Sequence, residues 1–163
     1  MDSKKAYYVD VTGIIIKDGK YLITKRASHK TAFPNKWTVP GGKLEPQDYE
    51  NGKADTNAGH WYNICENTLI REVMEETGLK IKNIKYLTSL VFRRPDNIPV
   101  VVISLFADYS EGEIKLCPDS TEHAWVTLEE AKNYDLIDGI YEELEMLDNH
   151  LKGNSVNKWE KTQ

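Results

Sequence analysis

Short segments rich in β-branched and aromatic residues alternate with polar turns along this chain, and they predict β-strands. Residues 7–16 and 21–25 both show this enrichment, and Asp18-Gly19 between them is a strong turn signal. This combination is typical of a β-hairpin. Further strands are expected over residues 37–39, 84–93, 100–109 and 124–126.

Helical patterns occupy the middle and the end of the chain. A helix is expected from residue 61 or 62 to residue 77, and Gly78 is placed to end it in a left-handed conformation. Thr127, with Glu130 three residues later, forms a capping-box signal for a short helix. A final helix is expected over residues 138–151. This mixture of strands and helices predicts a layered α/β (α+β) fold.

Residues 1–163 are expected to form a single domain, because this length allows one sizeable core. Residues 46–61 are polar and rich in turn residues, which favours a surface loop over a linker between domains. His60 and Trp61 are expected on or beside that loop. Residues 153–163 are polar, and we expect them to fray.

Composition and charge narrow the class of protein. With 40% hydrophobic and 29% charged residues, the chain has the composition of a soluble globular protein. The net charge of −5 gives no basic surface for an extended nucleic acid, whereas a small anionic substrate is compatible with locally gathered cations. Cys65 and Cys117 lack metal-ligand spacing and are interpreted as isolated thiols. No apolar run has the length of a membrane span, so we expect no membrane partner and a cytoplasmic location.

Three glutamates at helical spacing mark the predicted middle helix as the chemical centre. Positions i, i+3 and i+4 share one helix face, and on this face stand Glu72, Glu75 and Glu76. Like charges at this spacing repel by about 0.2–0.5 kcal/mol per pair, so the cluster needs compensation. A hard divalent cation with oxygen ligands supplies it. The opposite face is expected to enter the core through Ile70, Val73 and Met74.

A glycine pair upstream adds to this interpretation. A glutamate-rich helix face is, by itself, more often only solvated surface. Gly41-Gly42 changes that balance, because a backbone without Cβ atoms can approach a ligand or metal closely and offer carbonyl oxygens. Magnesium commonly bridges carboxylates to substrate phosphates, and such a site can activate water. The implied reaction is metal-assisted attack of water on phosphorus.

The two segments together resemble the signature of the Nudix hydrolases. That signature is a glycine, five residues, Glu, seven residues and then Arg-Glu-x-x-Glu-Glu-x-Gly. The right half is complete over residues 71–78, and the left half is present over residues 41–45. The spacing between the halves exceeds that of the family by fifteen residues, which implies an inserted loop within 49–63. Counted forward from Gly42, the first glutamate of the signature falls on Asp48, the candidate for its replacement.

The resemblance spans residues 6–151 and implies an α/β/α sandwich around a mixed β-sheet. It implies Mg²⁺ or Mn²⁺ as cofactor, with ligands that by position are the carbonyl of Gly41 and the carboxylates of Glu72, Glu75 and Glu76. Arg71 joins the catalytic group, either orienting a neighbour or pairing with Glu75 at the surface.

Family members also place cations on the phosphates and a second acidic residue in a later loop. Arg26 ends the second strand and is our candidate for the phosphates. Arg93 and Arg94 either bind phosphate or solvate the end of a hairpin. Glu122 is the candidate second acid, with Glu113 and Asp119 behind it, and the general base is assigned to Glu72 or Glu122.

The function implied is Mg²⁺-dependent hydrolysis of the pyrophosphate bond in a nucleoside diphosphate linked to another moiety. A (modified) nucleoside triphosphate is preferred, with ADP-ribose or a nucleotide sugar as the alternative. The expected partner is therefore a small nucleotide, and both a monomer and a homodimer stay open.

Two readings of other classes compete with hydrolysis. Residues 29–37 look somewhat like a loop of isopentenyl-diphosphate isomerases, which use a cysteine and several histidines near it. Between Ala27 and Leu44 this chain has no cysteine and only His29, which disfavours isomerisation. A non-catalytic nucleotide-sensing module is expected to lose some of the three glutamates, and all three are retained here.

Overall fold

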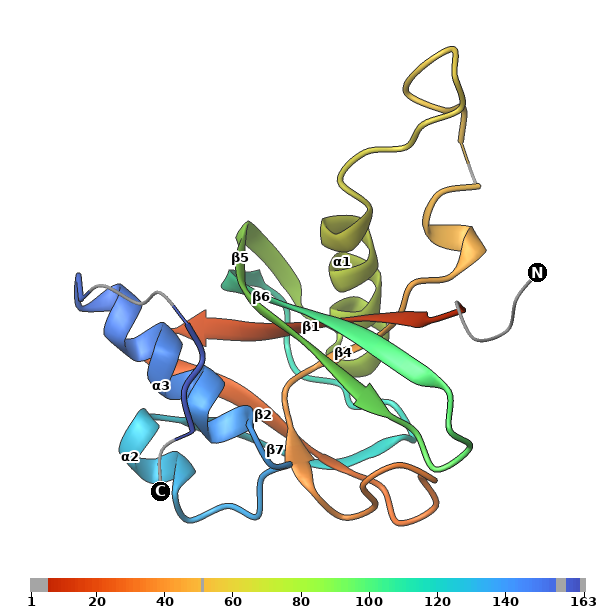
Figure 1. Ribbon diagram of the computed structural model, residues 1–163. Helices are drawn as coiled ribbons and strands as arrows, with labels where there is room; N and C mark the ends of the chain where they lie inside the picture. The colour runs from red at the N-terminus through yellow and green to blue at the C-terminus, as the bar shows by residue number, and fades with distance from the viewer. Residues whose placement is uncertain (1–5, 51, 155–157, 162–163) are drawn as a thin grey trace.

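The computed structural model describes residues 6–50, 52–154 and 158–161 of the chain. Figure 1 shows a sheet with helices on both sides and a long loop that projects from one end. In chain order the elements are β1 (Tyr8–Lys17), β2 (Lys20–Arg26), β3 (Trp37–Thr38), β4 (Gly41–Lys43), the 3-10 turn η2 (Pro46–Asp48), α1 (Ile64–Thr77), β5 (Lys80–Arg93), β6 (Pro99–Glu111), β7 (Ser120–Val126), α2 (Leu128–Ala131) and α3 (Ile140–Leu151).

The described residues form a mixed sheet of seven strands. Its main path runs β3-β2-β1-β6-β5, while β4 pairs with β1 and β7 pairs with β2. The β1–β6 pair is parallel and the other strand pairs are antiparallel. The predicted mixed α/β architecture is therefore confirmed.

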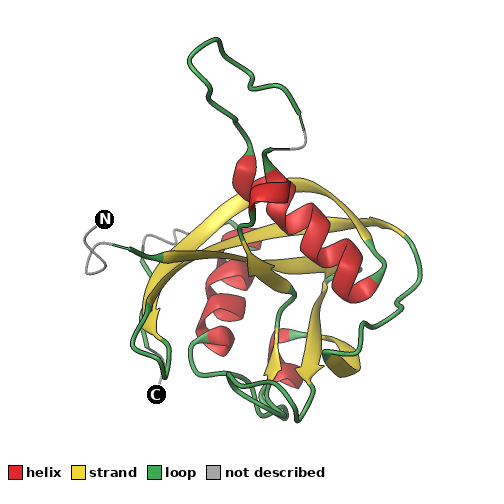
Figure 2. Ribbon diagram, turned by 90° about the vertical axis from the view of Figure 1, so that its right-hand side faces the viewer, coloured by secondary structure: helices red, strands yellow, loops and turns green. Residues whose placement is uncertain are grey.

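Two hydrophobic clusters make this sheet the middle layer of a sandwich. Alternate residues of β1 point to opposite faces, as strand geometry requires. Ile14 enters the cluster that includes Leu144 and Leu147 of α3. Ile15, on the other face, enters the cluster that includes Leu69 and Val73 of α1. The expected α/β/α sandwich follows from this alternation, and Figure 2 shows the two helices on opposite sides of the strands.

The turn and cap signals of the sequence are confirmed. Gly78 ends α1 in the left-handed region, with φ 71°, and its N–H donates to the carbonyl of Met74. The Thr127 hydroxyl accepts from the Glu130 amide, while the Glu130 carboxylate accepts from the Thr127 amide. Trp37 is buried in the α3-side cluster, where its ring meets Tyr134 edge-on at 4.8 Å.

Several element boundaries differ from the predictions. Helix α1 begins at Ile64 rather than at 61 or 62, because Asn63 precedes it with a left-handed φ of 55°, a conformation that asparagine tolerates. Strand β5 begins at Lys80 rather than 84, since its exposed, lysine-rich start pairs with the far end of β6. Strand β7 begins at Ser120, earlier than the expected residue 124. Helix α3 begins at Ile140, later than the expected residue 138.

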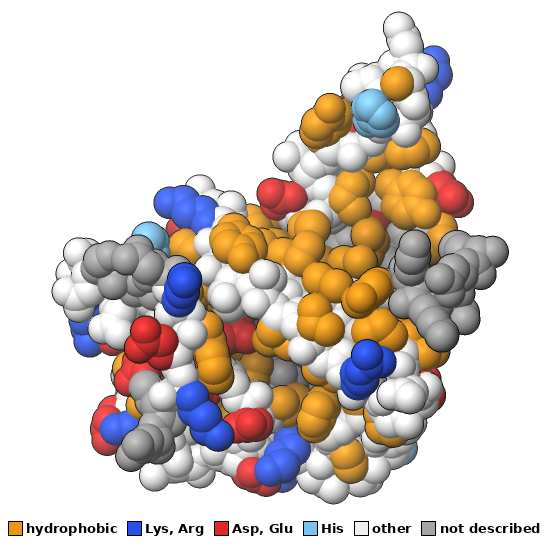
Figure 3. Space-filling view, in the orientation of Figure 1, with side chains coloured by type: hydrophobic (Ala, Val, Ile, Leu, Met, Phe, Trp, Pro, Cys, Tyr) orange, Lys and Arg blue, Asp and Glu red, His pale blue; other side chains and the backbone are white. Residues whose placement is uncertain are grey.

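The prediction for the apolar face of α1 was wrong in part. Val73 is fully buried, but Ile70 and Met74 are 45% and 40% exposed. Exposed apolar side chains also occur on β5, at Tyr86, Leu90 and Val91. Figure 3 shows hydrophobic side chains gathered over the middle of the face that Figure 1 presents.

The segment expected to be an inserted loop stands apart from the body. Residues 49–63 contain no helix or strand among their described positions and project beyond the end of α1. Inside this loop the rings of Tyr49 and Trp61 meet at 5.5 Å. The expected frayed segment 153–163 lies partly outside the described residues. None of the helices in the described part of the chain combines the length and the hydrophobicity that crossing a bilayer requires.

Strand β4 is the fold feature that positions the site. Residues 41–43 pair with β1, where Thr12 lies opposite Gly41 and Val11 lies opposite Gly42. The same strand contacts α1. The contact between β1 and this segment extends one residue beyond the paired positions, because the Gly13 N–H donates to the carbonyl of Pro40 just before β4 begins.

Gly13 offers a test of the contact between the sheet and α1. A Cβ at this position would meet the Leu69 side chain at 2.6 Å, and Leu69 is fully buried. We expect Gly13→Val to lower the free energy of unfolding by about 1–3 kcal/mol, as overpacking does. Denaturant titration measures the change. Gly52→Ala is the matched control, because a Cβ there meets nothing within 4 Å, and an equal loss in both variants would contradict the interpretation.

Candidate active site

The two glycines of β4 bring the backbone against the carboxylates of α1. A Cβ on Gly42 would lie 2.3–2.4 Å from the carboxylate atoms of Glu72, so only glycine leaves room for that group. A Cβ on Gly41 would lie 2.4 Å from the carbonyl oxygen of Val11. Both glycines are therefore required by close approach, as the sequence predicted for this pair.

Glu76 is held against this strand by a backbone hydrogen bond. The Gly41 amide donates to its Oε2 at 3.0 Å. The pKa of Glu76 is raised to about 7, mainly by burial and also by the negative charge of Glu72, while the Gly41 amide and the cations Arg26 and Lys30 act in the opposite direction. A carboxyl that titrates near neutrality is typical of functional sites.

Glu72 lies beside Glu76 and is similarly shielded from solvent. Its side chain is 13% exposed, and its Oε1 is 2.9 Å from Arg71 Nη1. Burial raises the pKa of Glu72 and Arg71 partly offsets this, while the charge of Glu75 adds to the rise. The charge of Glu72 also disfavours the ionised form of Glu76, and a cation bound beside the two carboxylates would offset this.

The third glutamate does not join this pair. Glu75 is 56% exposed, and its Oε2 accepts from Arg71 Nη1 at 3.0 Å, an i,i+4 pair along the helix. Within the described residues, no three His, Cys, Asp or Glu side chains are gathered as a group that could hold a metal ion. The sequence predicted all three carboxylates as metal ligands; in the structure Glu75 pairs with Arg71, which relieves the like-charge repulsion along α1.

Arg71 ties the chain segments of the motif together. Its Nε and Nη2 bind both oxygens of Asp48, at 2.5 and 3.1 Å, in the bidentate geometry that guanidinium favours. Its Nη2 also donates to the carbonyl of Lys43 at 2.9 Å. Asp48 is 1% exposed and also accepts from the amide of Glu45 and the hydroxyl of Thr68.

This network decides the ionisation of the Asp48–Arg71 pair. Burial opposes the charge of Asp48, but the hydrogen bonds from Arg71, Glu45 and Thr68 outweigh it and lower the pKa of this carboxyl. The hydrogen bond to Asp48 also raises the pKa of Arg71. The network makes Asp48 the acidic partner of Arg71, at the position where counting forward from Gly42 led us to expect the first glutamate of the signature.

Two adjoining cavities open in front of these residues. We call the larger one the outer basin; its volume is about 660 Å³, and both Glu72 and Glu76 line it. The smaller, inner cavity has a volume of about 240 Å³ and reaches toward α3 between apolar and hydroxyl side chains. Its lining includes Phe33 and Phe92, whose rings are 6.3 Å apart. Glu75 lines neither cavity.

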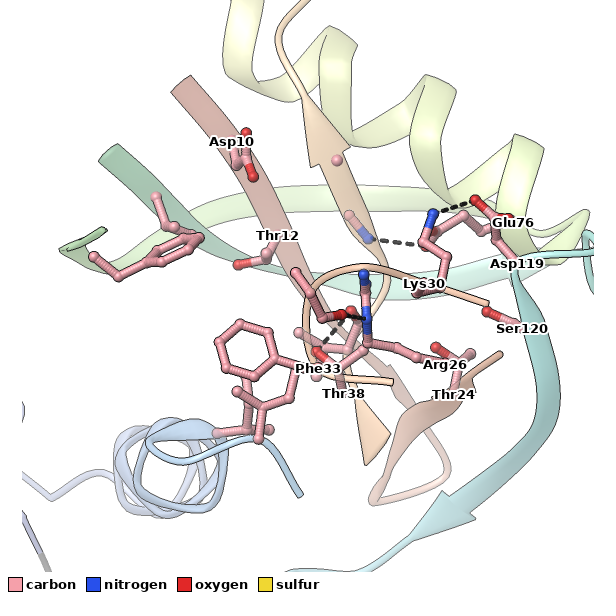
Figure 4. Close-up of a pocket in the computed structure, with 18 of the residues that line it drawn as sticks. Asp10, Thr12, Thr24, Arg26, Lys30, Phe33, Thr38, Glu76, Asp119 and Ser120 are labelled. Carbon is pink, nitrogen blue, oxygen red and sulfur yellow. Dashed lines mark hydrogen bonds and ion pairs between the residues drawn. The ribbon is translucent and has the colours of Figure 1, made fainter. Parts of the chain in front are cut away.

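Two cations and an acid line both cavities together with Glu76, and they come from the end of β2, the loop that follows it and the residue before β7. Arg26 lines both, and its Nε donates to the carbonyl of Ala32 at 2.8 Å. Lys30 also lines both and pairs with Asp119, which His29 contacts at 2.9 Å. Figure 4 shows the Arg26, Lys30 and Asp119 side chains on the same side of the cavity as Glu76. Sequence reasoning missed Lys30, which carries no motif signal.

The structure does not bring every expected residue to this place. Glu122 pairs with Lys25 at 2.6 Å across β2 and β7 and lines neither cavity. Glu113 lines neither cavity, whereas Asp119 lines both. Arg94 lines the outer basin, while Arg93 lines neither cavity and donates to the carbonyl of Asn97 at 3.3 Å.

Comparison with known proteins places this arrangement in a family. The family model described as the NUDIX domain matches residues 7–146. The chain belongs to the Nudix family. The expected resemblance is thus confirmed, as is the expectation, at the level of the family, of an enzyme that acts on phosphoanhydride bonds.

Individual relatives of this Nudix chain are more distant. It is 26% identical over 137 residues to the nucleoside triphosphatase NudI of Klebsiella pneumoniae, covering 77% of this chain and 86% of NudI. It is 44% identical over 120 residues to the NAD-capped RNA hydrolase NudC of an Enterobacter species, but spans only 38% of that protein. The crystal structure of a MutT protein from Methanosarcina mazei matches with TM-score 0.68 at 24% identity, covering 91% of this chain and 98% of the other. This last likeness shows the fold.

The donor set at the basin fits a hard divalent cation. Glu72 lies in the space that a Cβ on Gly42 would fill, Glu76 accepts from the Gly41 amide, and both carboxylates line the basin. Magnesium is commonly held by only one or two carboxylates together with waters and substrate phosphates. All the groups are oxygen donors, which suits Mg²⁺ or Mn²⁺ and not a softer metal.

The raised pKa of Glu76 predicts how stability depends on pH. Between the ordinary value of 4.5 and about 7, the folded chain binds one more proton than the unfolded chain. The free energy of unfolding therefore falls as pH rises through this window. We expect Glu76→Gln in metal-free buffer to match wild type near pH 4.5 and to exceed it at pH 8 by on the order of 2–3 kcal/mol.

Thermal unfolding at the two pH values measures this difference. For a chain of this size it amounts to several degrees in the melting temperature. The control is Glu66→Gln, which removes a carboxylate from the first turn of the same helix. A Glu76→Gln variant that gains nothing at pH 8, or gains equally at both pH values, would falsify the assignment.

Proposed function

We propose that this chain hydrolyses the pyrophosphate bond of a nucleoside diphosphate linked to another moiety, with a nucleoside triphosphate as the preferred class and Mg²⁺ or Mn²⁺ as cofactor. The observation that carries this proposal is the pair Glu72 and Glu76, held on the glycine strand at the outer basin. The relative NudI, most of which the chain covers, is named a nucleoside triphosphatase.

Glu72 and Glu76 are proposed to hold the metal, with the carbonyl of Gly41 as a neutral ligand. Glu75 joins them when it leaves Arg71, an exchange that a partly exposed ion pair allows at a cost below about 1 kcal/mol. A divalent cation bound there would neutralise phosphoryl charge and lower the pKa of a bound water. Arg71 keeps Glu72 oriented through their 2.9 Å contact while Asp48 anchors the guanidinium.

The cations of the outer basin are proposed to bind the phosphates. Arg26, Lys30 and Arg94 line it together with the two glutamates. The overall net charge of −5 does not attract an anionic substrate. These three side chains place positive charge locally, where it would compensate the charge of the phosphates. Arg93 is left out of this group, because its side chain is engaged at the β5–β6 hairpin.

Glu72 is proposed as the base that takes a proton from the attacking water. It is the one of the two expected bases that lines the basin, since Glu122 is paired with Lys25 elsewhere. Burial raises the pKa of Glu72, which suits a group that must accept and hold a proton. Asp119 takes the place expected for Glu122 as the second acid, because it faces both cavities.

The inner cavity is proposed to hold the nucleobase. Phe33 and Phe92 supply aromatic surface, and the hydroxyl of Thr38 and the carboxyl of Glu143 supply hydrogen-bonding groups. Glu143 is 2% exposed and accepts from the buried Ser104 hydroxyl at 2.5 Å. A mostly apolar pocket with a few polar groups is the common form of a small-molecule site.

ADP-ribose or a nucleotide sugar is the second candidate substrate. The observation that favours it is the size of the outer basin, which at about 660 Å³ exceeds the inner cavity and leaves room for a second moiety beside the phosphates.

Turnover of a nucleotide panel tests the proposed function. The panel contains the ribo- and deoxyribonucleoside triphosphates, an oxidised purine triphosphate, ADP-ribose and NAD, each with Mg²⁺ or Mn²⁺. We expect wild type to release a nucleoside monophosphate from at least one of them. Glu72→Gln and Glu76→Gln are expected to lower kcat by a factor of about 100 or more, because each removes a carboxylate that is proposed to hold the metal, and Glu72→Gln also removes the proposed base.

Glu66→Gln is the control and is expected to keep wild-type kcat, since it does not line either cavity. Far-UV circular dichroism verifies that each variant is folded. Tight nucleotide binding without turnover in either metal would favour a sensing module and overturn the proposal.

Metal binding has a separate readout in stability. A ligand that binds only the folded chain raises the free energy of unfolding, by about 2.7 kcal/mol when its concentration is a hundred times Kd, and so raises the melting temperature. We expect Mg²⁺ to stabilise wild type and not Gly42→Ala, because the added Cβ displaces the Glu72 carboxylate. Gly52→Ala keeps the response. The assignment fails if Gly42→Ala responds to Mg²⁺ as wild type does.

A further inference from the structure

Asp10 carries an unsatisfied polar atom. Its Oδ1 is buried without a hydrogen-bond partner, and in the described part of the chain no other buried side-chain nitrogen or oxygen is left so. Burial raises the pKa of Asp10 and the nearby charges of Lys43 and Arg94 act against this. A buried polar group without a partner is costly and needs an explanation.

The neighbouring cations do not satisfy this carboxyl. Lys43 lies opposite Asp10 in the β1–β4 pair, but its Nζ lies 4.9 Å above the ring of Tyr8. Arg94 lies over the same ring and pairs with Asp96 at 2.9 Å. Among the described residues, no ion pair or hydrogen bond reaches the Asp10 side chain, and in Figure 4 it stands without a dashed line.

Asp10 lies where the two cavities meet. It lines both the outer basin and the inner cavity, as does Phe92. Two residues further along β1, on the same face of the sheet, Thr12 lines only the inner cavity. Beyond it, Ile14 belongs to the closed α3-side cluster. Along this face of β1, Ile14 therefore lies in the core, Thr12 lines the inner cavity, and the unpaired carboxyl of Asp10 lies where that cavity joins the basin.

A nucleotide that spans both cavities has to pass this point. The following step rests on the proposed function, which assigns the phosphates to the outer basin and the base to the inner cavity. The part of a nucleotide that joins phosphate to base is the sugar, and its hydroxyl groups are hydrogen-bond donors. A carboxyl oxygen accepts such a bond, so binding would satisfy the atom that the free protein leaves unpaired.

We propose that Asp10 accepts a hydrogen bond from a sugar hydroxyl of the nucleotide and makes the enzyme selective for substrates that carry it. A site built around such a bond rejects the analogue that lacks the hydroxyl, because its own polar group is then left buried and unpaired. A hydrogen bond to a charged group corresponds to a factor of about 10 to 100 in affinity or kcat/KM.

The sugar of the substrate provides the test. For the ribonucleoside triphosphate that wild type turns over fastest, kcat/KM is compared with that of its 2′-deoxy and 3′-deoxy forms. We expect one deoxy form to lose a factor of about 10 or more in wild type. In Asp10→Val, which removes both oxygens at similar volume, we expect the ratio of kcat/KM for the ribonucleotide to kcat/KM for that deoxy form to fall to about 1. Asp10→Asn, which keeps one acceptor oxygen, is expected to lie between them.

A charge-matched control separates selectivity from general electrostatics. Asp18→Asn removes a carboxylate from the β1–β2 turn and is expected to keep the wild-type ratio. Asp10 loses no partner on substitution, so we expect its variants to melt at or above the wild-type temperature. Equal kcat/KM for the three sugars in wild type, or an unchanged ratio in Asp10→Val, overturns the inference.

A binding measurement keeps this result separate from the proposed function. Calorimetric titration with AMP and its 2′-deoxy and 3′-deoxy forms needs no turnover and no metal. We expect one deoxy form to bind wild type about ten times more weakly and Asp10→Val equally. If no nucleotide of the panel is hydrolysed but this pattern appears, the proposed function fails and the role of Asp10 stands. Equal affinities in wild type, or no binding of any of the three, contradict that role.

Discussion

The close approach of β4 to α1 is the constraint on which the site depends. Two glycines of β4 lie against α1, and the Glu72 carboxylate fills the space that a Cβ on Gly42 would take. The Gly41 amide donates to Glu76, and Gly42 leaves the volume that Glu72 occupies. Because β4 is also paired with β1, the carboxylates are fixed relative to the whole sheet, and with it to both cavities.

This approach gathers negative charge, and the structure compensates it in two ways. Arg71 binds Asp48 and contacts Glu72 and Glu75, so one guanidinium serves three acids and the carbonyl of Lys43. The Glu76 carboxyl takes no part in this network, and burial is the main cause of its raised pKa. Its ionised form is thus disfavoured at the turn of α1 that lines the basin. Stability given up at a site that binds charge is a common feature of enzymes.

Local signals in the sequence predicted most of the architecture. The turn at Asp18-Gly19, the cap at Gly78 and the box at Thr127 are confirmed, because each depends on residues adjacent in the chain. The start of β5 was missed because pairing with β6, rather than any hydrophobic alternation, makes it a strand. The exposure of Ile70 and Met74 was missed. Helical periodicity shows which residues share a face of the helix, but it does not show how much of that face other elements cover.

The residues of the candidate site that belong to a motif could be predicted from its spacing. Residues that reach the site from segments distant in sequence could not. Glu72, Glu76 and the glycines were found from spacing alone, whereas Lys30 and Asp10 lie on loop and strand positions that carry no such signal. The turn of Glu75 toward Arg71 depends on competition between neighbouring charges, which spacing leaves open. The preference for Asp119 over Glu122 required the register of β7 against β2.

The position of Asp48 has a consequence for the length of the chain between the two halves of the motif. Asp48 ends η2 and binds Arg71, and the projecting loop starts at the next residue and returns at Asn63, just before α1. The Asp48–Arg71 contact joins the two halves of the motif at the base of the loop, and it uses no residue of the loop itself. Doubling such a loop costs only about 0.6 kcal/mol of closure entropy. This segment is thus the place in the enzyme where evolution or an engineer can lengthen, shorten or replace sequence while the carboxylates keep their positions.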